Sequence, residues 1–367
     1  MMKNKQCALI VGLAIATLLS GGILFAQDGL SSETAGFAQK ITGALADLGS
    51  SDEAKKIAAI DQLGQLGATA AVDKSGVVDA LAAQLQSSSP VVQAHAAHAL
   101  GQMGAKAKPA SEALIALVGS DDETLRREAV RALAKIRPGP KRTVPALARL
   151  LADGSPTVRT SALHALAEVG APAVPMLIEA LGNDKTDYWA MLVLAELGPD
   201  AKDAIPALVE QLSSNRAENR REALICLGKI GPASASAIPA LEKLLDARRG
   251  DAVLGVAFVL GSIGPEAKKA ADRLKPYVAD PDQLTRMTCA WAIAKTNPNN
   301  KMLVRRATKI LAESLRSKQP RVRLAAVRGL ASLRPGPAIA MPAIREALMN
   351  ADKETLDSGL EALASMG

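Results

Sequence analysis

The sequence predicts an all-α protein, a right-handed α-solenoid of about ten two-helix repeats. Two observations carry this prediction. A short phrase recurs along the 367-residue chain: a small residue, Leu, a small residue, a polar residue, an apolar residue and then Gly or another helix-ending residue. The composition is 49% hydrophobic but only 2% aromatic. Thin layers of paired helices suit this composition better than one thick core, which would use more aromatic side chains.

The last position of each phrase, called the repeat mark from here on, sets the register. The marks are Gly67, Gly104, Arg137, Gly170, Gly198, Gly231, Gly264, Asn297, Arg334 and Gly367. Six of the nine intervals between successive marks are 33 residues, and the others are 37, 28 and 37. Regular spacing of this kind is the signature of a repeat architecture, so we interpret the chain as one repeat array.

Each repeat is predicted to contain two helices. The first opens with an apolar residue, Pro, Ala and Leu, as in residues 144–147, 205–208 and 238–241, because Pro is tolerated in the first turn of a helix. A polar turn follows, as at residues 153–156. The second helix then runs to the mark, where Gly is expected to adopt the left-handed cap conformation.

Two positions before each mark explain why the repeats would stack. In the last nine repeats, the position four residues before the mark is Leu or Ile. The position three residues before the mark is always Gly or Ala. These positions share one helix face with the mostly apolar position seven before the mark. A single repeat cannot bury that face alone, so neighbouring repeats must cover it.

Residues 1–26 are predicted to be a signal peptide, and residues 27–367 the repeat solenoid. Residues 1–5 are basic, residues 8–19 are apolar or small, and polar residues begin after Ala26. This order is that of a secretory signal. The alternative is an uncleaved membrane anchor, because the apolar stretch is just long enough to span a bilayer. Either interpretation predicts an exported repeat body, periplasmic or extracellular, and in the second case anchored to the membrane.

The remaining composition gives weaker guidance. A formal net charge of +7 favours acidic partners only slightly. Beyond the leader the cysteines are Cys226 and Cys289, two repeats apart and too distant for a disulfide. We expect both to be small buried residues on helices.

The repeats resemble HEAT-like repeats, in particular the short variety named after phycocyanobilin lyases. The matching features are an apolar-Arg pair opening the second helix, as at residues 158–159 and 322–323, and the Leu-Gly-x-Ile-Gly ending at residues 227–231 and 260–264. The resemblance covers roughly residues 35 to 367 and implies the solenoid fold. It leaves function open, because this family contains scaffolds, adaptors and a few enzymes.

No catalytic, cofactor-binding or metal-binding pattern is evident in the sequence. His95 and His98 share a helix face and His164 lies two repeats later, but a zinc site would need more ligands within reach. We therefore expect no cofactor and no enzymatic activity. A bilin lyase is the alternative that the resemblance implies, but that chemistry belongs inside a cell. Nucleic-acid binding is disfavoured by the same export signal.

The most informative pattern lies on the second helices, away from the core. Positions nine, six and two before each mark face the concave side in HEAT-like solenoids. In the middle repeats this face becomes large and apolar, and we call these residues the apolar stripe: Trp189, Leu192, Ile225, Phe258 and Trp291. Aromatic anchors are enriched where proteins bind one another. The alternative is that these side chains pack against each other as a secondary core.

A second candidate surface is basic. Cationic residues gather within residues 302–336, where Glu313 is the single acidic residue. We call the following cations the basic patch: Arg305, Arg306, Lys309, Arg316, Arg321 and Arg328. Such a patch binds polyanions or a membrane surface, although exposed cations are also ordinary surface residues.

Together these observations predict an exported scaffold or adaptor. Its partner would be a protein or peptide bound through the apolar stripe on the concave face. The alternatives are a bilin-lyase-like enzyme, or polyanion or membrane-surface binding through the basic patch.

Overall fold

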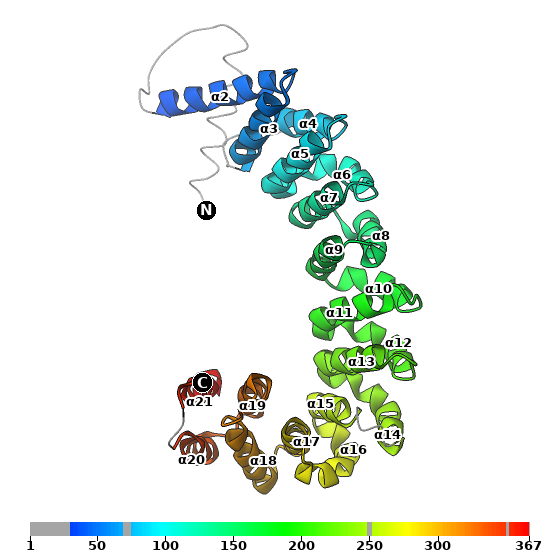
Figure 1. Ribbon diagram of the computed structural model, residues 1–367, viewed down its shortest axis with the longest axis vertical. Coiled ribbons are helices and arrows are strands. Elements are labelled where there is room, and N and C mark those ends of the chain that lie inside the picture. Colours follow the sequence, from blue (N-terminus) through cyan, green and yellow to red (C-terminus); the bar gives the residue numbers. More distant parts are fainter. Residues whose placement is uncertain (1–29, 69–74, 248–251, 350–351, 367) are drawn as a thin grey trace. The chain divides into compact units, whose positions relative to one another are not determined.

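Every regular element that the structure describes is a helix. The computed structural model describes residues 30–68, 75–247, 252–349 and 352–366. The chain divides into two compact units, Met1–Met176 and Leu177–Gly367, and each is a stack of helix pairs (Figure 1). This confirms the predicted all-α solenoid. The predicted signal peptide or anchor, residues 1–26, lies outside the described residues.

The described residues form ten helix pairs, one for each mark. The first unit contains α2 (Leu30–Asp47), α3 (Glu53–Ala68), α4 (Ser75–Gln84), α5 (Pro90–Met103), α6 (Ser111–Leu117), α7 (Glu123–Ile136), α8 (Pro140–Arg149) and α9 (Pro156–Val169). Helix α10 (Val174–Ala180) spans the boundary between the units. The second unit contains α11 (Asp187–Leu197), α12 (Ile205–Gln211), α13 (Ala217–Ile230), α14 (Ile238–Asp246), α15 (Val253–Ile263), α16 (Lys268–Ala271), α17 (Gln283–Thr296), α18 (Lys301–Ser314), α19 (Pro320–Leu333), α20 (Pro337–Leu348) and α21 (Lys353–Met366).

The marks end the second helices, but not in the expected conformation. Gly170 follows α9 with φ 78° and ψ −149°, and Gly264 follows α15 with φ 85° and ψ −143°. These values lie close to a region that essentially only Gly occupies, because the backbone must leave the helix extended to start the next repeat. The left-handed cap that we expected at Gly occurs instead at two non-glycine marks, Arg137 and Arg334.

The expected prolines are only partly placed as predicted. Pro206 and Pro239 are the second residues of α12 and α14, as the sequence indicated. Pro145 lies inside α8, which begins five residues earlier at Pro140. Pro140 itself occupies the first turn, where its missing N–H costs nothing.

The core of each unit follows the predicted register. The Leu or Ile four residues before each mark is buried from Leu63 to Leu330, and Leu363 in the last repeat is half-buried. The small residue one position later lets neighbouring second helices approach closely. A Cβ on Gly101 of α5 would lie 3.1 Å from the Cα of Ala132 in α7, closer than ordinary van der Waals contact.

An arginine near the start of several second helices fixes the preceding turn. In the third repeat, Nη1 of Arg126 donates to the carbonyls of Ser120 and Asp121 at 2.9 and 3.0 Å. Its Nε and Nη2 hold both carboxylate oxygens of Asp153 in the next repeat, at 2.8 and 2.9 Å. The turn clamp recurs at Arg220, Arg286 and Arg323. The apolar-Arg pair of the sequence therefore has a structural role.

The two cysteines are free and buried, as expected. The Cys226 thiol donates to the carbonyl of Met191 at 2.9 Å. Burial raises the pKa of Cys289 to about 12 and raises that of Cys226 further. Both thiols therefore stay protonated and unreactive at neutral pH, because the thiolate is the reactive form.

One helical run among the described residues, Ala217–Asp246, is long and apolar enough to cross a membrane by length and composition alone. It joins α13 to α14 and so belongs to two repeats, and half of its most apolar window is buried inside the structure. A buried core helix has the same character, so this run carries little weight as a membrane span.

Replacing Gly101 by Val should lower the free energy of unfolding by about 1–3 kcal/mol, because the added carbons have no room against the backbone of Ala132. Chemical denaturation monitored by circular dichroism measures the change. Gly154→Val is the control, because a Cβ there meets nothing within 4 Å. Equal losses in the two variants would contradict the close-approach argument.

Asp153→Asn should destabilise the protein at neutral pH by about 1–3 kcal/mol, because a charged hydrogen-bonded pair is lost. Burial raises the pKa of Asp153, but the hydrogen bonds from Arg126 and from the Ser155 N–H outweigh burial and lower it. Because the pKa of Asp153 is lower in the folded protein than in the unfolded chain, the stabilisation is complete above about pH 4. It is lost as the pH falls through the pKa of the folded protein. Denaturation at a series of pH values should show the difference between the two proteins shrinking in acid. A difference that is constant down to pH 2 would refute this account.

Candidate binding site on the second helices

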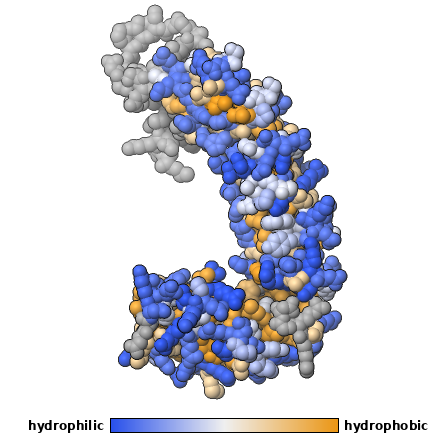
Figure 2. Space-filling view, viewed as in Figure 1, coloured by the Kyte–Doolittle hydropathy of each residue, from blue (hydrophilic) through white to orange (hydrophobic). Residues whose placement is uncertain are grey.

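The second helices share one face that points away from the buried Leu. It consists of the positions nine, six and two before each mark, which lie on one side of a helix because of their spacing. On the face of the molecule shown in Figure 2, hydrophilic residues cover most of the surface and hydrophobic residues form smaller patches. The character of the second-helix face differs between the two units.

In the second unit, four of the five apolar-stripe residues are half-buried and one is buried. Trp189 and Leu192 lie on α11, Ile225 on α13 and Phe258 on α15. Trp291 on α17 is buried, with 9% of its surface exposed. The stripe is therefore partly accessible and partly packed.

The packed end of the stripe is an aromatic pair. The rings of Phe258 and Trp291 stack with centroids 6.2 Å apart and planes 20° apart. Each ring also covers a glycine of the preceding repeat. A Cβ on Gly228 would lie 2.2 Å from Phe258, and one on Gly261 would lie 2.3 Å from Trp291. The indole Nε1–H of Trp291 donates to Oγ of Ser332 at 2.7 Å. These two side chains thus behave largely as secondary core.

The accessible end of the stripe lies on α11 and α13. Trp189 meets Tyr188 edge-on, with ring centroids 5.3 Å apart, and Leu192 and Ile225 are half-buried. Nearby, Glu222 is buried and pairs with Arg221 at 3.2 Å. Partly exposed apolar side chains beside a neutralised carboxylate are suited to contact with another protein.

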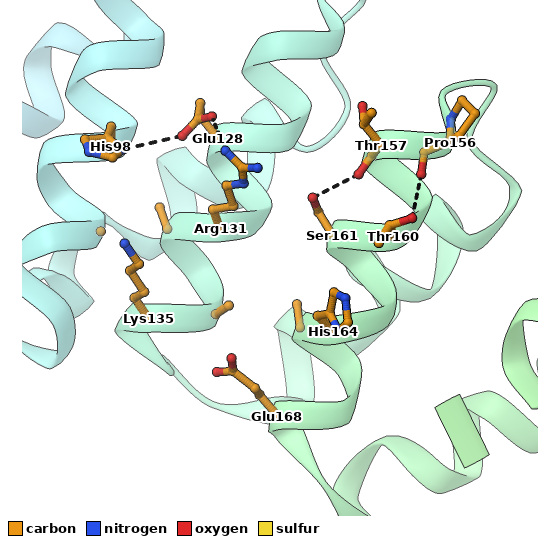
Figure 3. Close-up of a pocket in the computed structure, with 14 residues that line it drawn as sticks. His98, Glu128, Arg131, Lys135, Pro156, Thr157, Thr160, Ser161, His164 and Glu168 are labelled. Atoms are coloured by element: carbon orange, nitrogen blue, oxygen red, sulfur yellow. Dashed lines mark hydrogen bonds and ion pairs between the residues drawn. The ribbon is translucent and has the colours of Figure 1, made fainter. Parts of the chain in front are cut away.

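In the first unit the same face forms a polar groove of about 690 Å³ between α5, α7 and α9 (Figure 3). Its floor is made of small residues, Gly101, Ala132, Ala134 and Ala165. Its walls are mostly polar or charged: His98, Glu128, Arg131, Lys135, Pro156, Thr157, Thr160, Ser161, His164 and Glu168. This groove was not predicted from the sequence, although small residues beside charged ones on the second helices are a signal of it.

Glu128 organises one wall of the groove. Its carboxylate is nearly buried and accepts from Nη1 of Arg131 at 3.0 Å and from Nε of Arg127 at 3.3 Å. Nδ1 of His98 lies 3.5 Å from the other oxygen. A buried carboxylate is costly unless it is paired, so these partners compensate its charge and leave little negative potential for a ligand.

The opposite wall offers hydroxyls and an imidazole from α9. Thr160 and Ser161 donate to the carbonyls of Pro156 and Thr157, at 2.9 Å in both cases. Each hydroxyl oxygen keeps lone pairs that can accept. His164 is exposed, and Glu168 pairs with Arg137 at 3.3 Å. The groove thus presents both donors and acceptors to a ligand.

The histidines do not converge. His95 on α5 bonds through Nδ1 to Asp61 at 2.8 Å, outside the groove, whereas His98 and His164 line the groove from two different helices, α5 and α9. Among the described residues no group of three His, Cys, Asp or Glu side chains is placed to hold a metal ion.

The basic-patch residues are all exposed, but they occupy different elements. Arg305, Arg306 and Lys309 lie on α18, and Arg321 and Arg328 on α19, with Arg316 in the turn between them. Lys309 approaches Glu313 at 4.0 Å and Arg321 donates to Gln319. Since these contacts are solvent-exposed, they neutralise the patch only weakly.

A family model described as HEAT repeats matches residues 41–134, 111–191 and 175–260, and no curated protein matches the sequence significantly. The phycocyanobilin-lyase subtype remains a resemblance only, since the matched model is the general one.

Among solved structures, the Kap95p structure with RanGDP is similar, with a TM-score of 0.63 and 12% identity over 90% of this chain and 52% of that one. Importin beta has a TM-score of 0.62 and 14% identity, over 93% of this chain and 56% of that one. Kap121p bound to Pho4p has a TM-score of 0.59 and 14% identity, over 90% of this chain and 42% of that one. The chain spans about half the length of these proteins, and identities this low show a shared fold alone.

Ser332→Ala should destabilise the protein by about 1 kcal/mol, because the part-buried hydrogen bond from the indole N–H of Trp291 is lost. Denaturation curves followed by tryptophan fluorescence measure the loss. Ser262→Ala is the matched control, since Ser262, like Ser332, stands two residues before its mark, two repeats earlier. If both variants unfold alike, the hydrogen bond contributes nothing measurable.

Proposed function

The chain belongs to the HEAT repeat family, and on that premise we propose that it is an exported scaffold that binds a partner protein or peptide through its second-helix face. The observation that carries the proposal is the accessible end of the apolar stripe, where Trp189, Leu192 and Ile225 remain half-buried. Their counterparts Phe258 and Trp291 are stacked on each other and on glycines. We therefore narrow the docking site to α11 and α13.

Two further observations support a binding role rather than catalysis. Kap95p and Kap121p, which share the fold, are seen with RanGDP and with Pho4p. The side chains of the second-helix face that are buried and charged, Glu128 and Glu222, are paired with arginines. Paired carboxylates of this kind contribute to structure.

Export is part of the proposal and rests on the basic, apolar and small-residue order of residues 1–26. The buried, protonated thiols of Cys226 and Cys289 are compatible with an oxidising compartment, because neither forms the reactive thiolate readily.

A second candidate function, binding to a polyanion or an anionic membrane surface, is favoured by one observation. Six cations of the basic patch are exposed on α18, α19 and the turn between them, and only Lys309 among them has a carboxylate partner within 4.0 Å in the described part of the chain. Binding of this kind weakens steeply with salt.

Leu192→Ser with Ile225→Ser should abolish capture of the partner from the envelope fraction of the native host, because two partly exposed apolar contacts are removed. Mass spectrometry of proteins retained by immobilised wild type and variant measures this. The control carries Val91→Ser and Met302→Ser, which replace apolar side chains exposed by 50% and 78% outside the stripe.

A protein retained by wild type and control but lost from the stripe variant supports the proposal. Equal retention by all three would overturn the site. Retention that disappears for all three in 0.5 M salt would instead favour the basic patch, and its six cations would be the next residues to replace.

A further inference from the structure

Exposed large apolar side chains are concentrated in the last repeats of the second unit. Of the seven such residues in the described part of the chain, six lie between Met302 and Leu360. Two of the six are on first helices: Met302 on α18, exposed by 78%, and Met341 on α20, exposed by 51%. Among the described side chains, no other first helix carries one. Single exposed apolar residues are ordinary, so their neighbours decide what these two methionines mean.

The same two helices carry exposed cations beside the methionines. The residues three, four and seven positions after Met302 are cationic, and so is the residue four positions after Met341. This spacing places each set on one side of its helix. All of these side chains are exposed. We call them the α18–α20 face: Met302, Arg305, Arg306, Lys309, Met341 and Arg345.

The two helices are neighbours, so their exposed sides form one surface. Helix α18 packs against α20, and α19 packs against α21. In Figure 1, α18 and α20 lie side by side, with α19 and α21 on their other side. The opposite side of each first helix is buried, for example at Leu311 of α18 and Ile344 of α20. The α18–α20 face is therefore directed away from the core.

The α18–α20 face is positively charged. The two helices contain five Lys or Arg residues and two carboxylates, those of Glu313 and Glu346. Lys309 approaches Glu313 at 4.0 Å, but both side chains are largely exposed, so this contact neutralises little. The three arginines of the face have no carboxylate within 4.0 Å in the described part of the chain. Unneutralised cations therefore stand beside exposed apolar side chains.

The surface of an anionic lipid bilayer matches both features at once. Its head groups attract Lys and Arg, and apolar side chains enter the boundary between head groups and acyl chains. A water-soluble polyanion would contact the cations alone and leave Met302 and Met341 in water, where apolar surface is unfavourable. The exposed methionines therefore favour a membrane over a polyanion.

We propose that the α18–α20 face binds the surface of an anionic lipid bilayer, with Met302 and Met341 inserted below the head groups. The inference rests on the second candidate function and assigns the membrane as its ligand. It adds α20 and the two methionines to the site. Because the contact is made by first helices, Arg321 and Arg328 on the second helix α19 take no part in it.

The test measures partition of the predicted mature protein, without residues 1–26, onto vesicles by sedimentation. The vesicles contain phosphatidylglycerol and phosphatidylcholine in about equal parts, and vesicles of phosphatidylcholine alone are the neutral comparison. Arg305→Gln with Arg306→Gln should lower partition about 25-fold, since each cation near an anionic surface contributes about fivefold. The matched control, Arg321→Gln with Arg328→Gln, removes two charges from the same repeat and should lower partition less than about threefold, because of screening.

Met302→Gln with Met341→Gln tests the apolar part of the face. Partition onto anionic vesicles should fall about tenfold, because insertion contributes in proportion to the apolar area buried. Binding to heparin, a soluble polyanion, should stay unchanged. The control is Val91→Gln with Leu324→Gln, which replaces two exposed apolar residues outside the face and should alter neither measurement.

A fluorescent label at residue 302 reports insertion directly. Met302→Cys can be labelled selectively with the polarity-sensitive dye NBD, because the native thiols Cys226 and Cys289 are buried and protonated. On anionic vesicles the emission should move to shorter wavelength and become protected from iodide quenching. The same label on Leu324→Cys should keep the emission that it has in water.

Several results would overturn the inference: no preference for anionic vesicles, equal losses in the two arginine pairs, or unchanged partition of the methionine variant. Heparin binding without vesicle binding would refute the inference and leave the second candidate function standing. Absence of both would refute that candidate function as well. None of these results concerns protein capture by α11 and α13, so the scaffold proposal is tested separately.

Discussion

The closeness of neighbouring second helices depends on the residue three positions before each mark. Where that residue is Gly64 or Gly101, an added Cβ would come within 2.8 Å of Ala99 or 3.1 Å of Ala132. A larger side chain would push the helices apart, and the adjacent buried Leu would lose its contacts with the next repeat. Each repeat contacts mainly its neighbours, so this small residue controls the stacking on which the core of each unit rests.

The same constraint shapes the surface. The space beside a small residue is filled by the next repeat, and what fills it differs between the units. Phe258 and Trp291 lie over Gly228 and Gly261 in the second unit, whereas in the first unit the backbone of Ala132 approaches Gly101. The packing that holds the repeats together therefore also determines where the second-helix face is accessible.

The repeat register, the ends of the second helices and the buried Leu positions could be predicted from the sequence, because they depend on spacing along one helix. The conformation at Gly170 could not, since the direction of the next repeat decides it. Nor could the burial of Trp291, which depends on Gly261 and on Ser332 in other repeats. The groove could not be predicted for the same reason. Its walls come from three repeats, and each repeat alone has the sequence pattern of an ordinary polar surface.

The contact between Phe258 and Gly228 also has an evolutionary consequence. Repeat arrays grow and shrink by duplication and loss of whole units, but a unit whose glycine is covered by its successor's ring is not freely exchangeable. Moving the ring without the glycine creates a clash, and moving the glycine without the ring leaves a void. The repeats carrying Gly228, Phe258, Gly261 and Trp291 should therefore be inherited together, as one block within an otherwise modular array.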